Sequence, residues 1–282
     1  MKKIPFIKMH GAGNDFVFIS REESKIPITS KLATLLLDRH FGIGGDQLLL
    51  LNPGKNLLNH NLTIFNSDGS QAEMCGNGVR AVAYYLLGQK KIKNGSIIHT
   101  KGGPKVIGIK GSKIDVDMGE PILEGKKIPV KASGEIKNYL LKLPPHPSLS
   151  PKREGQVRVH CVSMGNPHCV VFVHNVDQFP VKELGPRIET HPFFPNRVNV
   201  EFVQVINSRE IKARVWERGA GETLACGTGA CAIGVASARA GKTARDVKIH
   251  LPGGVLFVRW DNNNHVFLSG PAQTTYSGQF LI

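Results

Sequence analysis

Hydrophobic and polar residues change their pattern several times along the chain, and the changes predict many short strands and few helices. The runs "VIGIKGSKIDVDMGEP" and "VKIHLPGGVLFVRWDNNNHVFLSG" are broken by glycine turns, which predicts short β-strands. The run "VRAVAYYLL", residues 79–87, is apolar nearly all round, so it predicts a buried helix that ends near Gly88. A second helix of small residues is expected from about 230 to 240, before Gly241, and a third around residues 30–40.

One strand-loop-helix pattern occurs twice in the chain. The runs "HGAGNDFVFI" and "SMGNPHCVVFV" each place Gly-Asn ahead of an alternating apolar segment, which makes Asn14 and Asn166 candidate equivalents. Cys75 follows Asn14 by 61 residues, and Cys226 follows Asn166 by 60. Two further polar residues each lie nine residues before one of these cysteines, Asn66 and Glu217. The matched spacings predict an ancient duplication that gave two similar domains.

Each half mixes strands with few helices, so the predicted fold class is α+β with two pseudo-symmetric domains. We expect an N-terminal domain of residues 1–122 plus 272–282 and a C-terminal domain of residues 123–271. Between the halves, "LPPHPSLSPKREGQ" at 143–156 is rich in Pro and Ser and has no helical or strand period. This composition predicts a mobile surface loop that carries no chemistry.

Composition bounds the size and the location of the protein. With 282 residues, of which 41% are hydrophobic, the chain can bury a sizeable core. The apolar run in "MKKIPFIKMHGAGND" is broken by Pro5 and Lys8, so the start lacks the apolar region of a signal peptide. No apolar stretch approaches the roughly 20 residues that cross a bilayer. We therefore expect a cytoplasmic protein without membrane contacts.

The charged residues and the cysteines argue against a nucleic-acid-binding protein and against a metal-binding or disulfide-rich protein. The formal net charge is +14, but the basic residues are scattered and are not interleaved with exposed aromatic residues. A nucleic-acid partner is therefore not expected, although a basic nucleic-acid-binding protein remains the alternative from a different class. Five cysteines without a CxxC pair, and histidines that lack zinc-ligand spacing, indicate reduced thiols and no metal site.

Two of the cysteines precede glycine-containing turns at helix starts, in "AEMCGNG" and "LACGTG". A helix N-terminus presents unpaired N–H groups and the positive end of the helix dipole, so it is expected to lower the pKa of a thiol. The same N–H groups could bind a carboxylate. Cys75 and Cys226 are thus candidate reactive residues, whereas Cys161, Cys169 and Cys231 are expected to be buried small hydrophobic residues.

Two equivalent acid/base groups fit a reaction that inverts a carbon centre. One thiolate would remove a proton from one face of the carbon, and the other thiol would return a proton to the opposite face. The pattern therefore predicts a two-base racemase or epimerase without a cofactor. A disulfide between Cys75 and Cys226 remains open as an oxidised state.

The motifs of the chain resemble those of the diaminopimelate epimerase family over nearly its whole length. In order, they are "KMHGAGNDF", "HFGIGGDQLLL", "FNSDGSQAEMCGNGVRA", "SMGNPHCVVFV", "RVNVEF", "ERGAGETLACGTGACA" and "LPGGVLF". The resemblance implies two domains, each an antiparallel barrel-like sheet around a central helix, with the active site between them. It also implies interconversion of LL- and meso-2,6-diaminoheptanedioate, a step in bacterial lysine and cell-wall precursor synthesis.

The resemblance also implies roles for individual residues. Cys75 and Cys226 would be the catalytic bases, and His168 and Glu217 would modulate their protonation. The residues that would bind the substrate, the last four of them through backbone amides, are Asn14, Gln47, Asn66, Asn166, Asn199, Glu217, Arg218, Gly76, Asn77, Gly227 and Thr228. No cofactor is implied. The family pattern further implies a homodimer, with Tyr276 at its interface.

Another cysteine-pair racemase, such as a proline racemase, remains the nearest alternative. The run "ERGAGETLACGTG" favours the diaminopimelate branch. The chain departs from the family pattern in a longer 143–156 segment and in Gly45, where a bulkier residue is common. Gln47 is only one of the residues found at its position.

Overall fold

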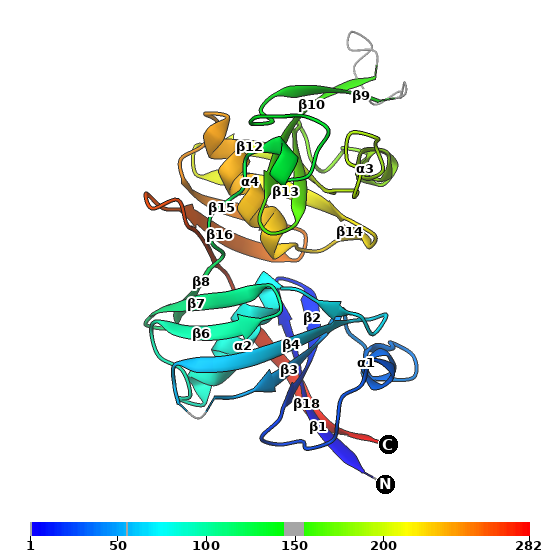
Figure 1. The fold of residues 1–282 in the computed structure, drawn as a ribbon, viewed down its shortest axis with the longest axis vertical. Coiled ribbons are helices and arrows are strands. Elements are labelled where there is room, and N and C mark those ends of the chain that lie inside the picture. Colours follow the sequence, from blue (N-terminus) through cyan, green and yellow to red (C-terminus); the bar gives the residue numbers. More distant parts are fainter. Residues whose placement is uncertain (1, 55, 144–154) are drawn as a thin grey trace. The chain divides into compact units, whose positions relative to one another are not determined.

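The computed structural model describes residues 2–54, 56–143 and 155–282. The chain divides into two units. Unit 1 consists of Met1–Asp117 and Ser269–Ile282, and unit 2 of Met118–Leu268 (Figure 1). The division into domains at 122/123 and 271/272 stays a prediction. Residues 144–154 of the predicted surface loop lie outside the described residues.

Unit 1 is a curved sheet that holds one central helix. Its strands pair in the order β18, β1, β2, β3, β4, β6, β7 and β8, with β5 beside β4. The bounds are β1 (Lys3–Gly11), β2 (Asn14–Ser20), β3 (Gln47–Asn52), β4 (Asn59–Asn66), β5 (Gln71–Ala72), β6 (Ser96–Thr100), β7 (Gly103–Lys110), β8 (Lys113–Asp117), β18 (Gln273–Leu281), α1 (Ser30–Leu37) and α2 (Gly76–Gly88).

Unit 2 repeats this plan. Its strands pair in the order β9, β10, β11, β12, β13, β15 and β16, with β14 beside β13. The bounds are η1 (Gly125–Lys127), β9 (Tyr139–Lys142), β10 (Gln156–Ser163), β11 (Pro167–Phe172), α3 (Val181–Glu189), β12 (Asn199–Asn207), β13 (Glu210–Glu217), β14 (Gly221–Thr223), α4 (Gly227–Arg239), β15 (Asp246–Leu251), β16 (Gly254–Trp260) and β17 (Val266–Ser269).

The two units match element by element. The order strand, helix, three strands, helix recurs as β2-α1-β3-β4-β5-α2 and β11-α3-β12-β13-β14-α4. The pairs β2–β3 and β4–β6 are parallel, and so are the corresponding pairs β11–β12 and β13–β15. The predicted α+β class with two similar units is confirmed, but each sheet is mixed and not purely antiparallel. The parallel pairs arise because a helix connects their strands.

The central helices are wrapped by the sheets of their own units (Figure 1). α2 contacts β1, β3 and β8, and α4 contacts β10, β11, β12, β15 and β16. Small residues let α4 approach its sheet: a Cβ on Gly234 would lie 2.7 Å from Val258 Cγ1. The first residues of both helices are buried; of the cysteines that precede them, Cys226 is buried and Cys75 is half-buried.

The predicted helices are present, and one helix was missed. α2 ends at Gly88 as predicted, whereas α4 begins at Gly227, three residues before the predicted start. α3 was not predicted, because Gly185 and Pro186 in its middle obscure the helical pattern. Gly185 is required there, since a Cβ would lie 2.6 Å from the ring of Trp216. Within the described residues, no helix has both the length and the apolar character to span a membrane.

Candidate active site

Cys75 begins the central helix of unit 1 as its N-cap residue. Its sulfur accepts a hydrogen bond from the backbone N–H of Gly78 at 3.3 Å and donates one to Asn14 Oδ1 at 3.5 Å. Gly78 is needed because a Cβ there would lie 2.9 Å from Leu49 Cδ2 and 3.5 Å from the sulfur. The glycine turn that the sequence singled out therefore brings the thiol onto the first turn of the helix.

The predicted contacts Gln47 and Asn66 lie side by side at the ends of β3 and β4. Gln47 Nε2 donates to Asn66 Oδ1 at 3.0 Å, and Asn66 Nδ2 donates to Ser70 Oγ at 3.1 Å. Gln47 Oε1 is buried and has no hydrogen-bond partner among the described residues. A buried acceptor without a donor is costly, so this oxygen is suited to a ligand that donates a hydrogen bond.

Asn77 turns its side chain into unit 1, toward a buried arginine. Arg80 Nη2 donates to Asn77 Oδ1 at 2.9 Å, and Arg80 Nε donates to the Pro271 carbonyl at 3.2 Å. Both side chains are almost fully buried. Because the Asn77 side chain faces Arg80, Gly76 and Asn77 could bind a carboxylate only through their backbone N–H groups. Arg80 was missed because its partner Pro271 is 191 residues away in the sequence.

Cys226 begins the central helix of unit 2 in the same way. Its sulfur accepts from the backbone N–H of Gly229 at 3.4 Å and lies 3.4 Å from Thr228 Oγ1. Asn166 Nδ2 donates to the same Thr228 oxygen at 3.3 Å. With Gly227 at the first helical position, the structure brings these predicted residues together.

His168 links this cluster to a carboxylate that the sequence analysis missed. His168 Nε2 lies 3.0 Å from Asn166 Oδ1, and His168 Nδ1 lies 2.6 Å from Glu201 Oε1. His168 and Glu201 are both completely buried. Glu201 Oε1 also lies 3.0 Å from the position that a Cβ on Gly229 would occupy. The signal that could have indicated this buried pair is a charged residue, Glu201, between apolar neighbours in "RVNVEF".

Asn199, Glu217 and Arg218 gather where β12 begins and β13 ends. Asn199 Nδ2 donates to the Pro167 carbonyl at 2.9 Å, and Asn199 Oδ1 accepts from the backbone N–H of Arg218 at 2.9 Å. Thr223 Oγ1 donates to Glu217 Oε1 at 2.6 Å. The Arg218 guanidinium contacts the Asn196 carbonyl at 3.2 Å.

The environment of Cys226 overturns one expectation from the sequence. Burial raises the pKa of the Cys226 thiol well above its ordinary value, and the negative charge of Glu217 raises it further. Hydrogen bonds from Thr228 and Gly229 oppose these effects without cancelling them. The prediction that the helix N-terminus lowers the pKa is therefore wrong for Cys226, because its side chain is only 6% exposed.

The two units differ in the residues that follow the matched polar positions on two adjacent strands. Unit 2 places His168 and Glu201 two residues after Asn166 and Asn199, on β11 and β12. The corresponding residues of unit 1 are Phe16 and Leu49, on β2 and β3. Burial raises the pKa of Glu201, and the adjacent His168 opposes that shift. Unit 2 therefore has a buried polar pair next to the turn that follows Cys226, whereas apolar side chains occupy the same positions in unit 1.

Cys161, Cys169 and Cys231 are buried within strands and a helix, as predicted, and the five cysteines, all among the described residues, form no disulfide bond. Among the residues that the structure describes, no group of three or more His, Cys, Asp or Glu side chains could hold a metal ion.

Solved structures place the chain in a fold class, and the name of one of these structures is that of an epimerase. A phenazine biosynthesis protein of the PhzF family from Bacillus anthracis is similar with a TM-score of 0.68, at 16% identity and full coverage of both chains. A hydroxyproline epimerase from Agrobacterium vitis has a TM-score of 0.64 at 15% identity, covering 99% of this chain and 91% of that one. Identities this low show the fold alone.

Sequence comparison narrows this class to one family. The profile of diaminopimelate epimerase matches residues 6–124 and 160–275. The diaminopimelate epimerase of Acetivibrio thermocellus is 46% identical, and the match covers 97% of each chain. That of Leptospira biflexa is 44% identical, over 99% of this chain and 100% of its own. The chain belongs to the diaminopimelate epimerase family.

Proposed function

We propose that the protein interconverts LL- and meso-2,6-diaminoheptanedioate without a cofactor, with Cys75 and Cys226 as the two bases. The observation that carries the proposal is that each of two like units places one cysteine at the start of its buried helix. Membership in the diaminopimelate epimerase family supports the choice of substrate.

In the proposed reaction, one thiolate takes the α-proton and the other thiol gives its proton to the opposite face of the same carbon. The Cα–H bond breaks, its electron pair is delocalised into the carboxylate, and a new C–H bond forms with inversion. The first sulfur is then protonated and the second is a thiolate, so the reverse reaction can follow. The raised pKa of Cys226 makes its thiolate, once formed, a stronger base for a weakly acidic α-proton.

Backbone and side-chain groups would stabilise the charge that develops. The N–H groups of the first helical residues meet the reacting carboxylate at the positive end of a helix dipole. The proposed amide donors are Gly76, Asn77, Gly227 and Thr228. The proposed side-chain contacts to the amino and carboxylate groups are Asn14, Gln47, Asn66, Asn166, Asn199, Glu217 and Arg218.

The proposal is tested by proton exchange at the α-carbon of LL-diaminopimelate in D₂O under reducing conditions, with L-proline alongside. We expect deuterium incorporation together with formation of the meso isomer, while proline stays inert. Exchange of proline without exchange of diaminopimelate would assign a proline racemase activity instead. If neither compound exchanged with the reduced protein, the two-base proposal would be wrong.

Replacement of either proposed base is expected to abolish epimerisation. Cys75→Ala and Cys226→Ala each leave one face of the α-carbon without a proton donor or acceptor. Cys231→Ala is the matched control, because Cys231 is fully buried within α4. Steady-state formation of the meso isomer measures the effect. Full turnover by either of the first two variants would contradict the assignment.

We further propose a homodimer formed through β18. The side chains of Tyr276, Leu281 and Ile282 are 46%, 49% and 41% exposed, an apolar surface that a second copy could cover. Light scattering of the wild type and of Tyr276→Ala tests this proposal: a dimer that the substitution weakens is expected. A monomeric wild type would rule it out.

A further inference from the structure

The side-chain amide of Asn14 carries an acceptor at one end and a donor at the other, so its orientation decides what Cys75 meets. Asn14 Oδ1 accepts a hydrogen bond from the Cys75 sulfur at 3.5 Å. Asn14 Nδ2 donates to Asp46 Oδ2 at 2.9 Å. With the opposite orientation, the NH₂ group would face the sulfur, and a donor there favours a thiolate over a thiol.

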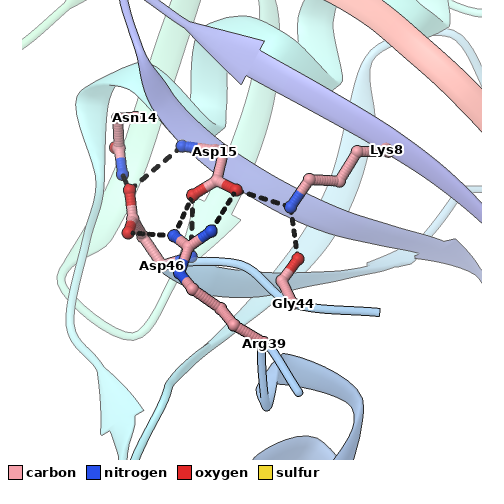
Figure 2. A network of polar contacts seen from close by, with 6 residues as sticks. All are labelled: Lys8, Asn14, Asp15, Arg39, Gly44 and Asp46. Atoms are coloured by element: carbon pink, nitrogen blue, oxygen red, sulfur yellow. Dashed lines mark hydrogen bonds and ion pairs between the residues drawn. The ribbon is translucent and has the colours of Figure 1, made fainter. Parts of the chain in front are cut away.

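Asp46 allows only one of these orientations. An ionised carboxylate accepts hydrogen bonds and donates none, so it can face the NH₂ end of Asn14 but not the carbonyl end. Asp46 Oδ2 also accepts from the backbone N–H of Asp15 at 3.1 Å. Asp46 Oδ1 accepts from Arg39 Nη2 at 2.9 Å. Both oxygens are thus held in place, as Figure 2 shows.

Asp15, Arg39 and Lys8 anchor this carboxylate from behind. Arg39 spans both aspartates, donating to Asp15 Oδ1 at 2.7 Å and to Asp15 Oδ2 at 3.1 Å. Lys8 Nζ donates to Asp15 Oδ2 at 2.6 Å and also to the Gly44 carbonyl (Figure 2). Burial alone would raise the pKa of Asp15, but hydrogen bonds from Arg39 and Lys8 lower it to about 2, so the network stays charged at neutral pH.

Gly45, the departure from the family pattern, lets the chain before β3 approach this network closely. A Cβ at that position would lie 3.2 Å from Lys8 Nζ and 3.3 Å from Leu37 Cδ2. The charged and titratable residues on the elements that carry Asn14, Cys75 and the network are Lys3, Lys8 and His10 on β1, Asp15 on β2, and Arg80, Tyr84 and Tyr85 on α2; the adjoining loops carry Asp38, Arg39, His40, Asp46 and Glu73.

We propose that Asp46 is a positioning residue for Cys75: it holds the Asn14 amide with its carbonyl toward the sulfur and so favours the protonated thiol. Unit 2 holds the equivalent asparagine the other way, because His168 faces Asn166 Oδ1 and the NH₂ group of Asn166 faces Thr228. Different polar neighbours thus orient the two asparagines differently. The importance of this thiol for turnover rests on the proposed function, but the positioning itself does not.

The test is the pH dependence of Cys75 alkylation by iodoacetamide, followed by mass spectrometry of the Cys75 peptide. In Asp46→Ala, the Asn14 amide is free to turn its NH₂ group to the sulfur. We expect alkylation at pH 7 to be about tenfold faster, the change that follows from a shift of one unit in the midpoint. Asp46→Asn should stay close to the wild type, since its amide oxygen can still accept from Asn14 while Arg39, 57% exposed, turns to solvent.

Two controls separate orientation from loss of charge and from unfolding. Glu22→Ala removes a carboxylate with the same 46% side-chain exposure in the same unit, where it pairs with Lys91, and should not change the profile. In an Asn14→Ala background, Asp46→Ala should have no further effect, because the group it orients is absent. Thermal unfolding of each variant identifies any that does not fold.

Three results would overturn the proposal: profiles of Asp46→Ala and wild type that coincide, equal acceleration in Asp46→Ala and Asp46→Asn, or an acceleration that persists without Asn14. Turnover of LL-diaminopimelate by the same wild-type preparation is measured in parallel. A wild type that does not turn over would reject the proposed function, while the alkylation profiles would still decide whether Asp46 positions Asn14.

Discussion

Both cysteines cap the central helices of their units, and the surroundings of Cys226 raise the pKa of its thiol. Because burial and Glu217 raise the pKa of Cys226, its thiolate forms only above the ordinary pH range of a thiol. Alkylation of Cys226 should therefore be slow at neutral pH and should accelerate as the pH rises through the raised pKa.

Glu217→Gln removes the second of these causes and should move the alkylation profile of Cys226 to lower pH. The accessibility of the sulfur affects the rate at every pH, so the midpoint of the profile isolates the electrostatic effect. Site-resolved mass spectrometry measures it, with Glu135→Gln as a control in the same unit, where Glu135 pairs with Arg239. A midpoint that stayed in place or moved upward would contradict the role of Glu217.

Glu201 should matter through His168. Glu201 Oε1 lies 2.6 Å from one nitrogen of the buried His168 ring, and the other ring nitrogen lies 3.0 Å from Asn166 Oδ1, so the three side chains form one chain of contacts. Glu201→Gln keeps an acceptor for His168 but replaces the carboxylate by a neutral amide. Hydrogen bonds to charged groups contribute about 1–1.5 kcal/mol more than neutral ones, so Glu201→Gln should lower kcat/KM about five- to tenfold. Glu135→Gln should have no effect. Unchanged kinetics in Glu201→Gln would show that the buried pair does not act on the site.

At the residue scale, the sequence predicts the groups that a local pattern marks and misses those whose partners are remote. Cys75 and Cys226 stand out because glycine turns and apolar helices follow them. Glu201 does not, since a charged residue within a strand resembles an ordinary solvent-facing position and its partner His168 lies on another strand. Asp46 likewise contacts Asn14 across 32 residues of sequence, a distance that no local pattern spans.

At the scale of elements, close packing of the central helices depends on small residues. Gly234→Ala puts a methyl group 2.7 Å from Val258 Cγ1, so β16 or α4 must shift, and the expected destabilisation is about 1–3 kcal/mol. Gly88→Ala is the matched control, because nothing lies within 4 Å of its Cβ position at the end of α2. This second change should be neutral or stabilise the protein by about 0.4–1 kcal/mol.

Urea unfolding of both glycine variants measures these differences. The two tryptophans, Trp216 and Trp260, both belong to unit 2, so their fluorescence reports the unit that contains Gly234. Far-ultraviolet circular dichroism reports both units. Equal stability of Gly234→Ala and wild type would mean that the helix and the sheet can separate at no cost.

The same elements show where sequence patterns are sufficient and where they are not. Strands bounded by glycine turns and helices that are apolar all round carry their own signals, so their existence could be predicted. The mixed direction of the sheets could not, because whether two strands run parallel depends on the connection between them. α3 supplies that connection in unit 2, and its internal Gly185 and Pro186 conceal it.

At the scale of the whole molecule, unit 2 is inserted between two segments of unit 1. β18 pairs with β1 from Lys3 to His10 and closes one side of unit 1, where Phe280 packs on the core that contains Ile4 and Phe6. Deletion of residues 273–282 should therefore unfold the sheet of unit 1. It should leave unit 2 folded, because the hydrophobic cluster that contains Val159, Leu184 and Phe202 consists of residues of unit 2 alone.

Hydrogen exchange and tryptophan fluorescence test the deletion. Loss of amide protection in β1 to β4 is expected, together with a fluorescence transition in urea that resembles the wild type. Removal of Ile282 alone is the control, since it keeps the β1–β18 pairing. Retained protection in β1 to β4 would show that β18 is dispensable, and a lost fluorescence transition would show that unit 2 needs unit 1.

The β1–β18 pairing also sets the order in which a growing polypeptide can acquire its structure. A ribosome delivers β1 early, but the strand that covers it follows all of unit 2 in the sequence. The first half of the protein must therefore wait with an open sheet edge while the second half is made. Of the two units, the one that begins first during translation is the one that is completed last.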